Sequence, residues 1–308
     1  MYLQFNLIIY LMKNKSFLLL FFFLFLCQVS FAQQTILNDS NLPIMVISTD
    51  IDPDTNAPTD IPDEPKVLGS MQLIYRPDGS RNYLTDSTNE SFLNYKGRIG
   101  IELRGSSSQA LDKKPYGFTT LLQDGDSNNN VSLLGMPSEN DWVLNSLAYD
   151  PSMVRDYLSY TLASNMGNYA PRVQYIEVIV NGDYKGVYFL TEKVKRDSDR
   201  VNLKKIADDD NDFPDITGGY IIKADKTTGG DEIAWTMPNY GGWDTNFLHH
   251  YPKTEDITSA QANYIETIFY NLADQTNPAN TSIIDGYPSM IDIPSFVDYI
   301  LMAEIASN

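Results

Sequence analysis

The order in which strand-like and helix-like segments follow one another most strongly constrains the fold of this 308-residue chain. Short apolar or alternating segments, which are typical of β-strands, dominate the first two thirds. They cover 43–47, 67–75, 98–104, 116–122, 142–147, 173–180, 186–190 and 218–223. One helix is expected among them, at 151–166, and two more follow, after Thr258 and at 293–306. We therefore predict an α+β fold or two lobes, with a strand-rich N-terminal part before a helical part.

Turn and cap residues support several of these boundaries. The tripeptide Asn181-Gly182-Asp183 is typical of a tight β-hairpin. Asp150 suits the N-cap of the first helix, and Thr258 with Gln261 forms a capping box for the second. We expect 235–252, which is rich in Gly, Asn and aromatic residues, to be a surface excursion. The helix faces expected to pack inward are Val154, Leu158, Leu162 and Met166, then Ile265, Ile268, Phe269 and Leu272, then Phe296, Val297, Ile300 and Leu301.

The first 32 residues have the pattern of a secretory signal peptide. Lys13 and Lys15 precede the apolar segment 16–26, and Ser30-Phe31-Ala32 places small residues before a cut at Gln33. A membrane anchor needs about 20 apolar residues, which this segment reaches only if 1–10 joins it. We therefore expect an exported protein, secreted or at the cell surface, with no stable membrane span after cleavage. A polar leader, 33–41, would then precede a single domain at 42–308.

The processed chain is expected to contain no thiol and to be strongly acidic. Cys27, the only cysteine, is lost with the signal peptide, which excludes disulfides, zinc–thiolate sites and cysteine nucleophiles. Residues 33–308 carry 20 basic and 40 acidic side chains, so their net charge is about -20. Such a surface repels phosphate backbones, and a nucleic-acid partner is therefore not expected.

One basic cluster stands out from this acidic background. Arg104-Gly105-Ser106-Ser107-Ser108 follows a predicted strand, and Lys113-Lys114 comes a few residues later. The guanidinium, the serine hydroxyls, backbone N–H groups beside a glycine and the two ammonium groups together can hold phosphate oxygens. The Walker pattern is absent, so a Ser-rich turn with ordinary surface lysines is the alternative.

Neither a metal site nor a hydrolase triad is predicted within the chain. The acidic loops at 50–61 and 124–135 have the spacing of calcium loops, but they lack the glycine at position six and the glutamate at position twelve. His249 and His250 are the only histidines, and no cysteine remains to join them as a zinc ligand. They lie side by side in one predicted loop without a Gly-x-Ser-x-Gly elbow elsewhere, which argues against a Ser-His-Asp triad.

Several separate motifs occur in order along the chain. The first runs from Ile101 to Gln109, and the second is Lys113-Lys114-Pro115-Tyr116-Gly117-Phe118. The others are 133–137, 139–142, 153–155, 169–172, 181–188, Glu192-Lys193 and Gly218-Gly219-Tyr220. Together they resemble the CotH family of secreted kinase-like proteins, typified by a spore coat protein, over about 42–308.

The resemblance implies an atypical protein-kinase-like fold that transfers phosphate from ATP to Ser or Thr of a secreted or surface protein, with spore coat proteins as the known type of substrate. ATP and Mg²⁺, or Mn²⁺, are the implied cofactors. By the same resemblance, Arg104 with Ser106, Ser107 and Ser108 forms the loop over the phosphates. Either Lys113 or Lys114 is then the lysine that faces them.

Two further expectations concern the surroundings of that lysine. The resemblance places Thr191, Glu192 and Lys193 in a hinge beside the adenine, which they would contact through backbone atoms. The predicted helix 151–166 contains no glutamate to pair with the lysine, so Asp156 or Glu139 is expected to take that place.

The resemblance also bears on the C-terminal end. It implies that the catalytic and metal-binding carboxylates lie beyond Asn308, so the chain is expected to be a C-terminally incomplete fragment that is inactive alone. The alternative is a non-catalytic secreted surface or carbohydrate-associated binding module on the same scaffold. Its sugar-stacking residues would be Trp235, Tyr240, Trp243 and Tyr251.

Overall fold

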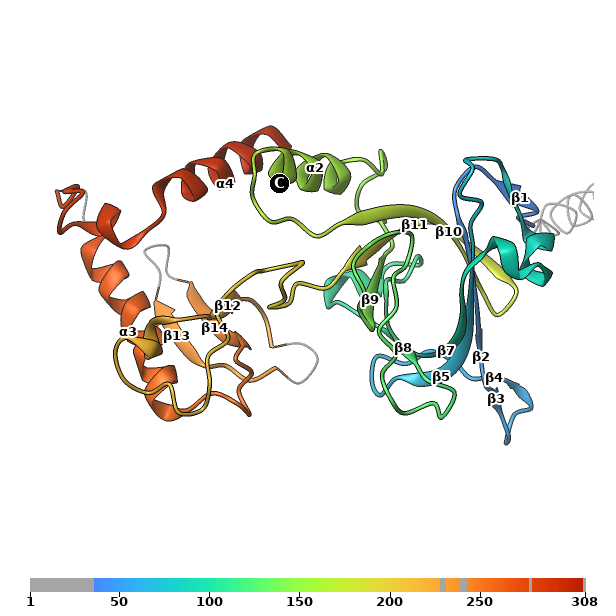
Figure 1. Cartoon of the computed structure of the whole chain (residues 1–308), viewed down its shortest axis with the longest axis horizontal. Helices are drawn as coiled ribbons and strands as arrows, with labels where there is room; N and C mark the ends of the chain where they lie inside the picture. Colours follow the sequence, from blue (N-terminus) through green and yellow to red (C-terminus); the bar gives the residue numbers. More distant parts are fainter. Residues whose placement is uncertain (1–35, 228–230, 239–242, 277–278, 307–308) are drawn as a thin grey trace, which may run out of the picture. The chain divides into compact units, whose positions relative to one another are not determined.

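A closed barrel of seven strands is the largest element of the structure (Figure 1). The computed structural model describes residues 36–227, 231–238, 243–276 and 279–306, and Leu37–Asn308 form one compact unit. The barrel strands are β2 (Ile44–Thr49), β5 (Val67–Ile74), β7 (Leu93–Leu103), β8 (Tyr116–Leu121), β9 (Asp141–Asn145), β10 (Val173–Val180) and β11 (Asp183–Glu192). Their order is β10-β11-β9-β8-β7-β5-β2, and a parallel pairing of β2 with β10 closes the ring of otherwise antiparallel neighbours.

The alternation of side chains along each strand explains why this barrel forms. Ile101, Phe118 and Trp142 are at most 1% exposed and point into one continuous apolar core. Their strand neighbours point to the outer face, as the two-residue period of a strand requires. The hairpin between β10 and β11 is confirmed, because Asn181 and Gly182 have positive φ angles of 51° and 79°.

Two pairs of short strands form separate small sheets in the same folded unit. Strand β1 (Asp39–Ser40) pairs with β6 (Asn82–Tyr83), and β3 (Ile51–Asp52) pairs with β4 (Ala57–Pro58). The predicted polar leader 33–41 therefore overlaps the folded unit. The predicted signal peptide 1–32 lies outside the described residues.

A second, three-stranded sheet follows the barrel in the sequence. It consists of β12 (Ile221–Ala224), β13 (Trp235–Pro238) and β14 (Asp244–Tyr251), with β14 in the middle. The expectation of a surface excursion at 235–252 was wrong, because Trp235 is buried and stacks on Phe247 at 5.1 Å between ring centroids. Helix α3 (Ser259–Gln275) follows, and its Phe269 closes over the same two rings. The predicted capping box of Thr258 and Gln261 is confirmed.

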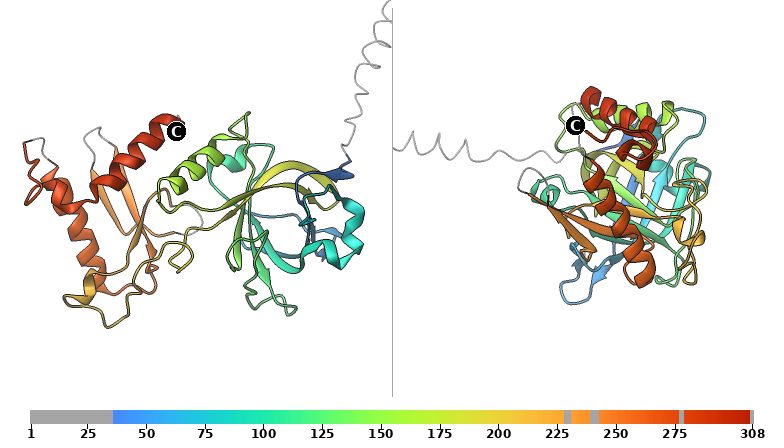
Figure 2. Two further views of the ribbon diagram at one scale, coloured as in Figure 1. Left: turned by 45° about the horizontal axis from the view of Figure 1, so that its top comes forward. Right: turned by 90° about the vertical axis from the view of Figure 1, so that its left-hand side faces the viewer.

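Helices α2 (Arg155–Asn165) and α4 (Ile293–Ala306) lie side by side (Figures 1 and 2), and Asn168 donates a hydrogen bond of 2.9 Å to Asp298. Helix α2 begins later than predicted, although the Asp150 carboxylate accepts the backbone N–H groups of Val154 and Arg155 at 2.9 Å each. The remaining short helices are of the 3₁₀ type: Leu84–Thr88, Glu90–Phe92, Ser107–Ala110, Asp215–Thr217 and Tyr287–Met290.

The predicted inward faces of these two helices were wrong. In α2 the small residues Ser159 and Ala163 are buried, whereas Leu158 is 53% exposed. In α4, all of whose residues the structure describes, none is buried, and Phe296 and Ile300 are 50% and 56% exposed. The apolar stripes thus predicted that these two segments are helices, but they did not predict which helix residues are buried.

The mixed architecture confirms the predicted α+β class, with a strand-rich part followed by helices. Among the described residues, no helix combines the length and the apolar character that crossing a membrane requires.

Candidate functional site

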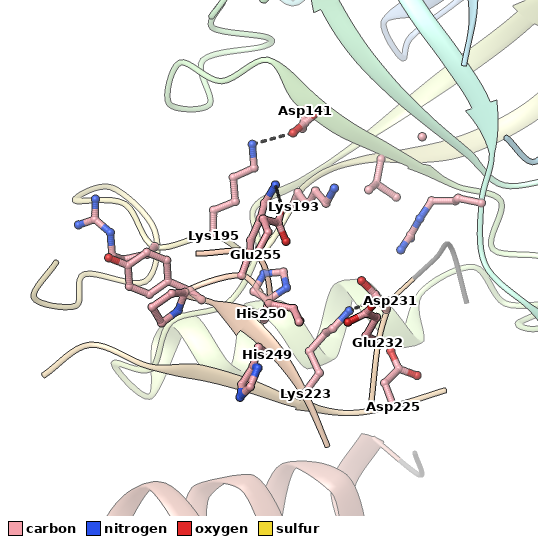
Figure 3. Close-up of a pocket in the computed structure, with 18 of the residues that line it drawn as sticks. Asp141, Lys193, Lys195, Lys223, Asp225, Asp231, Glu232, His249, His250 and Glu255 are labelled. Carbon is pink, nitrogen blue, oxygen red and sulfur yellow. Dashed lines mark hydrogen bonds and ion pairs between the residues drawn. The ribbon is translucent and has the colours of Figure 1, made fainter. Parts of the chain in front are cut away.

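A cleft of about 1430 Å³ opens within the folded unit (Figure 3). Strands β7, β8 and β9 contribute to its lining from the outside of the barrel, and β12 and β14 contribute from the second sheet. Many of the lining side chains are charged, with both signs present. The cleft is therefore a polar site rather than an apolar ligand pocket.

Strand register explains which barrel residues reach the cleft. Glu102 pairs with Gly117 across β7 and β8, and Asp141 pairs with Thr119 across β8 and β9. Because the neighbouring residues point into the core, these four lie on the outer face. Gly117 keeps this wall open, since a Cβ atom there would lie 3.3 Å from Oε1 of Glu102.

Asp141 is the centre of a network of charges on this wall. It accepts hydrogen bonds of 2.7 Å from Lys195 Nζ and from Thr119 Oγ1. Burial opposes its ionisation, but the hydrogen bonds and the positive charge of Lys195 outweigh burial and lower the pKa of Asp141 to about 2. Lys66 lies 3.8 Å from Asp141 and 3.7 Å from Glu102, and it donates to Thr119 at 2.7 Å. Asp141 is therefore a fixed anion and not a proton carrier near neutral pH.

Two cationic side chains of the cleft differ from Lys66 and Lys195. Arg104 follows β7 and Lys193 follows β11, and no described side chain forms an ion pair with either. Desolvation by the surrounding protein lowers the pKa of both groups, although both residues keep solvent-accessible atoms. The neighbouring charges of Lys66, Lys195 and Arg104 also lower the pKa of Lys193, and that of Asp141 raises it. Both cations therefore face the cleft without a bound counter-ion.

Carboxylates gather on the side of the second sheet, as Figure 3 shows. Lys223 of β12 forms an ion pair with Asp231, and Asp225 and Glu232 lie nearby. In the described part of the chain, no group of three or more His, Cys, Asp or Glu side chains is placed to hold a metal ion. Asp225 accepts the backbone N–H of Lys226 at 2.7 Å, and neither Asp225 nor Glu232 forms an ion pair with a described lysine or arginine side chain.

The two histidines are not arranged as a pair of metal ligands. His250 Nε2 lies 2.7 Å from the carbonyl oxygen of Val194, whereas the ring of His249 contacts that of Trp235 at 5.9 Å between centroids. Figure 3 shows the two rings on opposite sides of β14. His250 thus links the second sheet to the backbone that follows β11.

The residues of the predicted phosphate loop take different places. Arg104, Ser106 and Ser107 line the cleft. Ser108 lies beneath Gly105, which has a φ of +86° and whose added Cβ would come within 2.3 Å of Ser108 Oγ. The loop therefore requires glycine at this position.

Lys113 and Lys114 are not among the described lining residues. The Lys113 ammonium donates to the carbonyl oxygen of Val187 and lies 4.6 Å from the ring centroid of Tyr188. The Lys114 ammonium donates to the carbonyl oxygen of Gln109 at 2.7 Å and so braces the end of the Ser-rich turn. Binding of phosphate by these two lysines stays a prediction.

Glu192 occupies a buried ion cluster and does not line the cleft. Its side chain is 0% exposed and contacts Arg172 at 3.0 Å and Arg200 at 3.3 Å. The two acidic residues expected near the lysine pair have other partners, since Glu139 binds Lys195 at 3.0 Å and Asp156 accepts from Asn145 at 3.1 Å. Contact of the 191–193 segment with adenine stays a prediction.

Sequence reasoning missed the network around Asp141. Lys66, Asp141 and Lys195 stand on three separate segments, and only the barrel register brings them together. The position of Asp141 immediately before the apolar strand residues Trp142 and Val143 was the one signal available.

The three described aromatic residues predicted to stack on sugars lie in different surroundings. Trp235 is 6% exposed beneath Phe247, and Tyr251 is half-buried with its hydroxyl accepting the N–H of Ile206 at 3.3 Å. Trp243 is 78% exposed, and Tyr240 lies outside the described residues. Among these rings, Trp235 packs within the second sheet.

Comparison with known proteins bears on the matched part of the chain. Residues 101–308 match the family described as CotH kinase protein, which covers more than half of the sequence. No curated protein matches the chain. The matched segment includes the outer wall of the barrel from Glu102 onward and the whole second sheet.

Proposed function

Because the chain belongs to the CotH kinase family, we propose that its cleft binds ATP for transfer of the γ-phosphoryl group to Ser or Thr hydroxyls of another protein. A kinase-like fold is part of this proposal. The sequential order of the strand-rich barrel, the second sheet and the final helices supports it.

The placement of Arg104 at the cleft is the observation that carries the proposal. A guanidinium can donate two parallel hydrogen bonds to a phosphate group. The hydroxyls of Ser106 and Ser107 line the same cleft, so donors and positive charge converge there. Phosphoryl transfer depends mostly on positioning and on stabilising negative charge, which is what such a wall supplies.

A divalent cation is part of the proposal, and carboxylates of the second-sheet side would contribute to holding it, beside those that the family resemblance places beyond Asn308. Nucleotide-bound Mg²⁺ usually takes one or two protein carboxylates, while phosphates and waters supply its other ligands. Asp225 and Glu232 are the carboxylates that would contact Mg²⁺ or Mn²⁺. When bound, the ion would neutralise charge that develops on the phosphate oxygens.

The protein substrate and the place of action are the least constrained parts of the proposal. The pattern of residues 1–32 supports export, so the substrate would be a secreted, surface or coat protein. The cleft contains lysine and carboxylate side chains beyond Arg104, which offers polar contacts to an incoming peptide.

The test is titration calorimetry of the chain with ATP, ADP and adenosine, followed by transfer from γ-³²P-ATP with Mg²⁺ or Mn²⁺. We expect ATP to bind more tightly than adenosine, and Arg104→Met to weaken ATP binding by roughly tenfold or more. Lys96→Met, which changes an exposed lysine of β7 outside the cleft lining, is the matched control. Equal ATP binding by Arg104→Met and wild type, or no ATP binding at all, would contradict the proposal.

A further inference from the structure

We propose that Lys193 and Arg104 together form the anion-binding pair of the cleft, and that Lys193 is its phosphate-binding lysine. The pair would take a polyphosphate chain. That this chain belongs to a nucleotide rests on the proposed function, whereas the anion site itself rests on the geometry below.

The end of β11 fixes where Lys193 points. The preceding residue, Glu192, pairs in register with Trp142 and is held in place by Arg172 and Arg200. Lys193 is the next residue and lines the cleft together with Asp141, the neighbour of Trp142. The buried ion cluster thus anchors the residue from which the Lys193 side chain departs.

Most other cations near this wall are already occupied. Lys195 binds Asp141 and Glu139, and Lys66 lies between Glu102 and Asp141. Lys223 binds Asp231 on the second sheet. An ammonium that already has a carboxylate partner gains less from an incoming phosphate, because the existing pair must be broken or shared. Lys205 and Lys226 also line the cleft without a described carboxylate within ion-pair distance, but they lie outside the barrel strands and their ends. Lys193 is therefore the barrel-wall lysine whose ammonium has no such partner.

The electrostatic surroundings favour an anion between the two groups. Arg104 and Lys193 line the same cleft, and the charge of Arg104 contributes to the lowered pKa of Lys193. Two positive charges in one cleft repel each other, and an anion bound between them relieves this repulsion. The two side chains together therefore favour anion binding. Glu102 and Asp225 act on Arg104 with the opposite charge, and a metal ion carried by the polyphosphate would neutralise part of it.

The chemistry of the pair selects phosphate oxygens over a single carboxylate. Arg104 offers a planar fork of donors, and Lys193 offers a mobile point charge. Ser106 and Ser107 add hydroxyl donors at the same cleft. A chain of two or three phosphates offers more acceptor oxygens to these donors than one carboxylate group does.

The experiment measures binding of inorganic tripolyphosphate, ATP and adenosine to wild type, Lys193→Met, Lys193→Arg and Lys96→Met by titration calorimetry. Lys193→Met should weaken tripolyphosphate and ATP binding by roughly tenfold to a hundredfold and leave adenosine binding unchanged. Lys193→Arg should retain most of the affinity, because it keeps the charge, and Lys96→Met should behave as wild type. Circular dichroism and a thermal melt of each variant establish that its fold is intact.

Three results decide the matter. Wild-type affinity of Lys193→Met for tripolyphosphate would overturn the inference, and so would a wild-type protein that binds no tripolyphosphate. Lysine-dependent binding of tripolyphosphate without any binding of ATP would uphold the anion site and contradict the proposed function. The two proposals can therefore fail separately.

Discussion

The barrel and the helix pair α2–α4 use apolar residues in opposite ways. In the barrel, Phe118, Trp142 and Tyr188 are all but fully buried in a continuous core. In α4, a helix of 14 residues with an apolar sequence, every large apolar side chain named in the prediction remains about half exposed. The difference teaches that local pattern specifies an element, whereas burial depends on what the rest of the chain places against it.

The largest contrast should appear when one aromatic ring is removed from each region. Trp142→Ala should lower the free energy of unfolding by about 4 kcal/mol, because it leaves a cavity in the packed barrel. Phe296→Ala in α4 should change it by less than about 1 kcal/mol, since the ring is half exposed. Urea unfolding followed by circular dichroism measures both. Similar losses in the two variants would mean that α4 is packed as firmly as the barrel.

A second contrast compares a buried ion pair with an exposed one. Glu192→Gln should cost about 3 kcal/mol, because it leaves Arg172 and Arg200 without their shared carboxylate. Glu255→Gln is the matched control, since Glu255 and Lys253 form a pair whose side chains are 66% and 68% exposed. Its effect should stay below about 0.5 kcal/mol. A cost for Glu192→Gln as small as that of the control would show that the cluster is dispensable for folding.

The stabilising contribution of Asp141 to the free energy of unfolding should be lost in acid. Folding lowers the pKa of Asp141 from 3.8 to about 2, so its contribution is complete above pH 4 and is lost as the pH falls towards 2. The sign follows because the unfolded chain binds the proton more tightly than the folded chain does. The contribution is about 2 kcal/mol. Unfolding of wild type and Asp141→Asn between pH 2 and 6 should therefore converge at low pH, and parallel curves would contradict this.

The smallest effect on folding, with a measurable effect on binding, is expected at Gly117. This residue lies in β8 without a positive φ, and an alanine Cβ would lie 3.3 Å from the flexible side chain of Glu102, which must shift slightly, so Gly117→Ala should change stability by less than about 1 kcal/mol. Gly117→Val places methyl groups against Glu102 and should weaken ATP binding by roughly tenfold, a loss of about 1.4 kcal/mol. Calorimetry on both variants separates the two effects. Full ATP affinity in Gly117→Val would place the nucleotide away from this wall.

Sequence patterns predicted the barrel strands well, because each strand must bury one face and the two-residue period records it. The hairpin at Asn181-Gly182 and the capping box at Thr258 were also predicted correctly, since both depend on residues close together in the sequence. Strand β12 of the second sheet overlaps the predicted strand 218–223, but β13 and β14 were missed because Trp235 and Leu248 are separated by polar and glycine-rich sequence that resembles a loop.

The candidate site was predictable only in part. Arg104, Ser106 and Ser107 follow one strand and could be grouped from the sequence, and the structure places them at the cleft. Lys193 was assigned to a hinge through its backbone, and nothing in the sequence distinguished its ammonium from that of Lys195. The distinction depends on Asp141 and Glu139, whose hydrogen bonds occupy Lys195.

Closure of the barrel by β2 and β10 has a consequence for biosynthesis. Met45 of β2 pairs with Val178 of β10. The ring therefore cannot close until the chain has been synthesised through β10. Contacts between residues so far apart in sequence form late and slowly, because a long loop must be ordered first. Until then the nascent chain presents the unpaired edge of β2 and the apolar inner faces of strands β5 to β9. Such a chain is exposed to misassociation before closure.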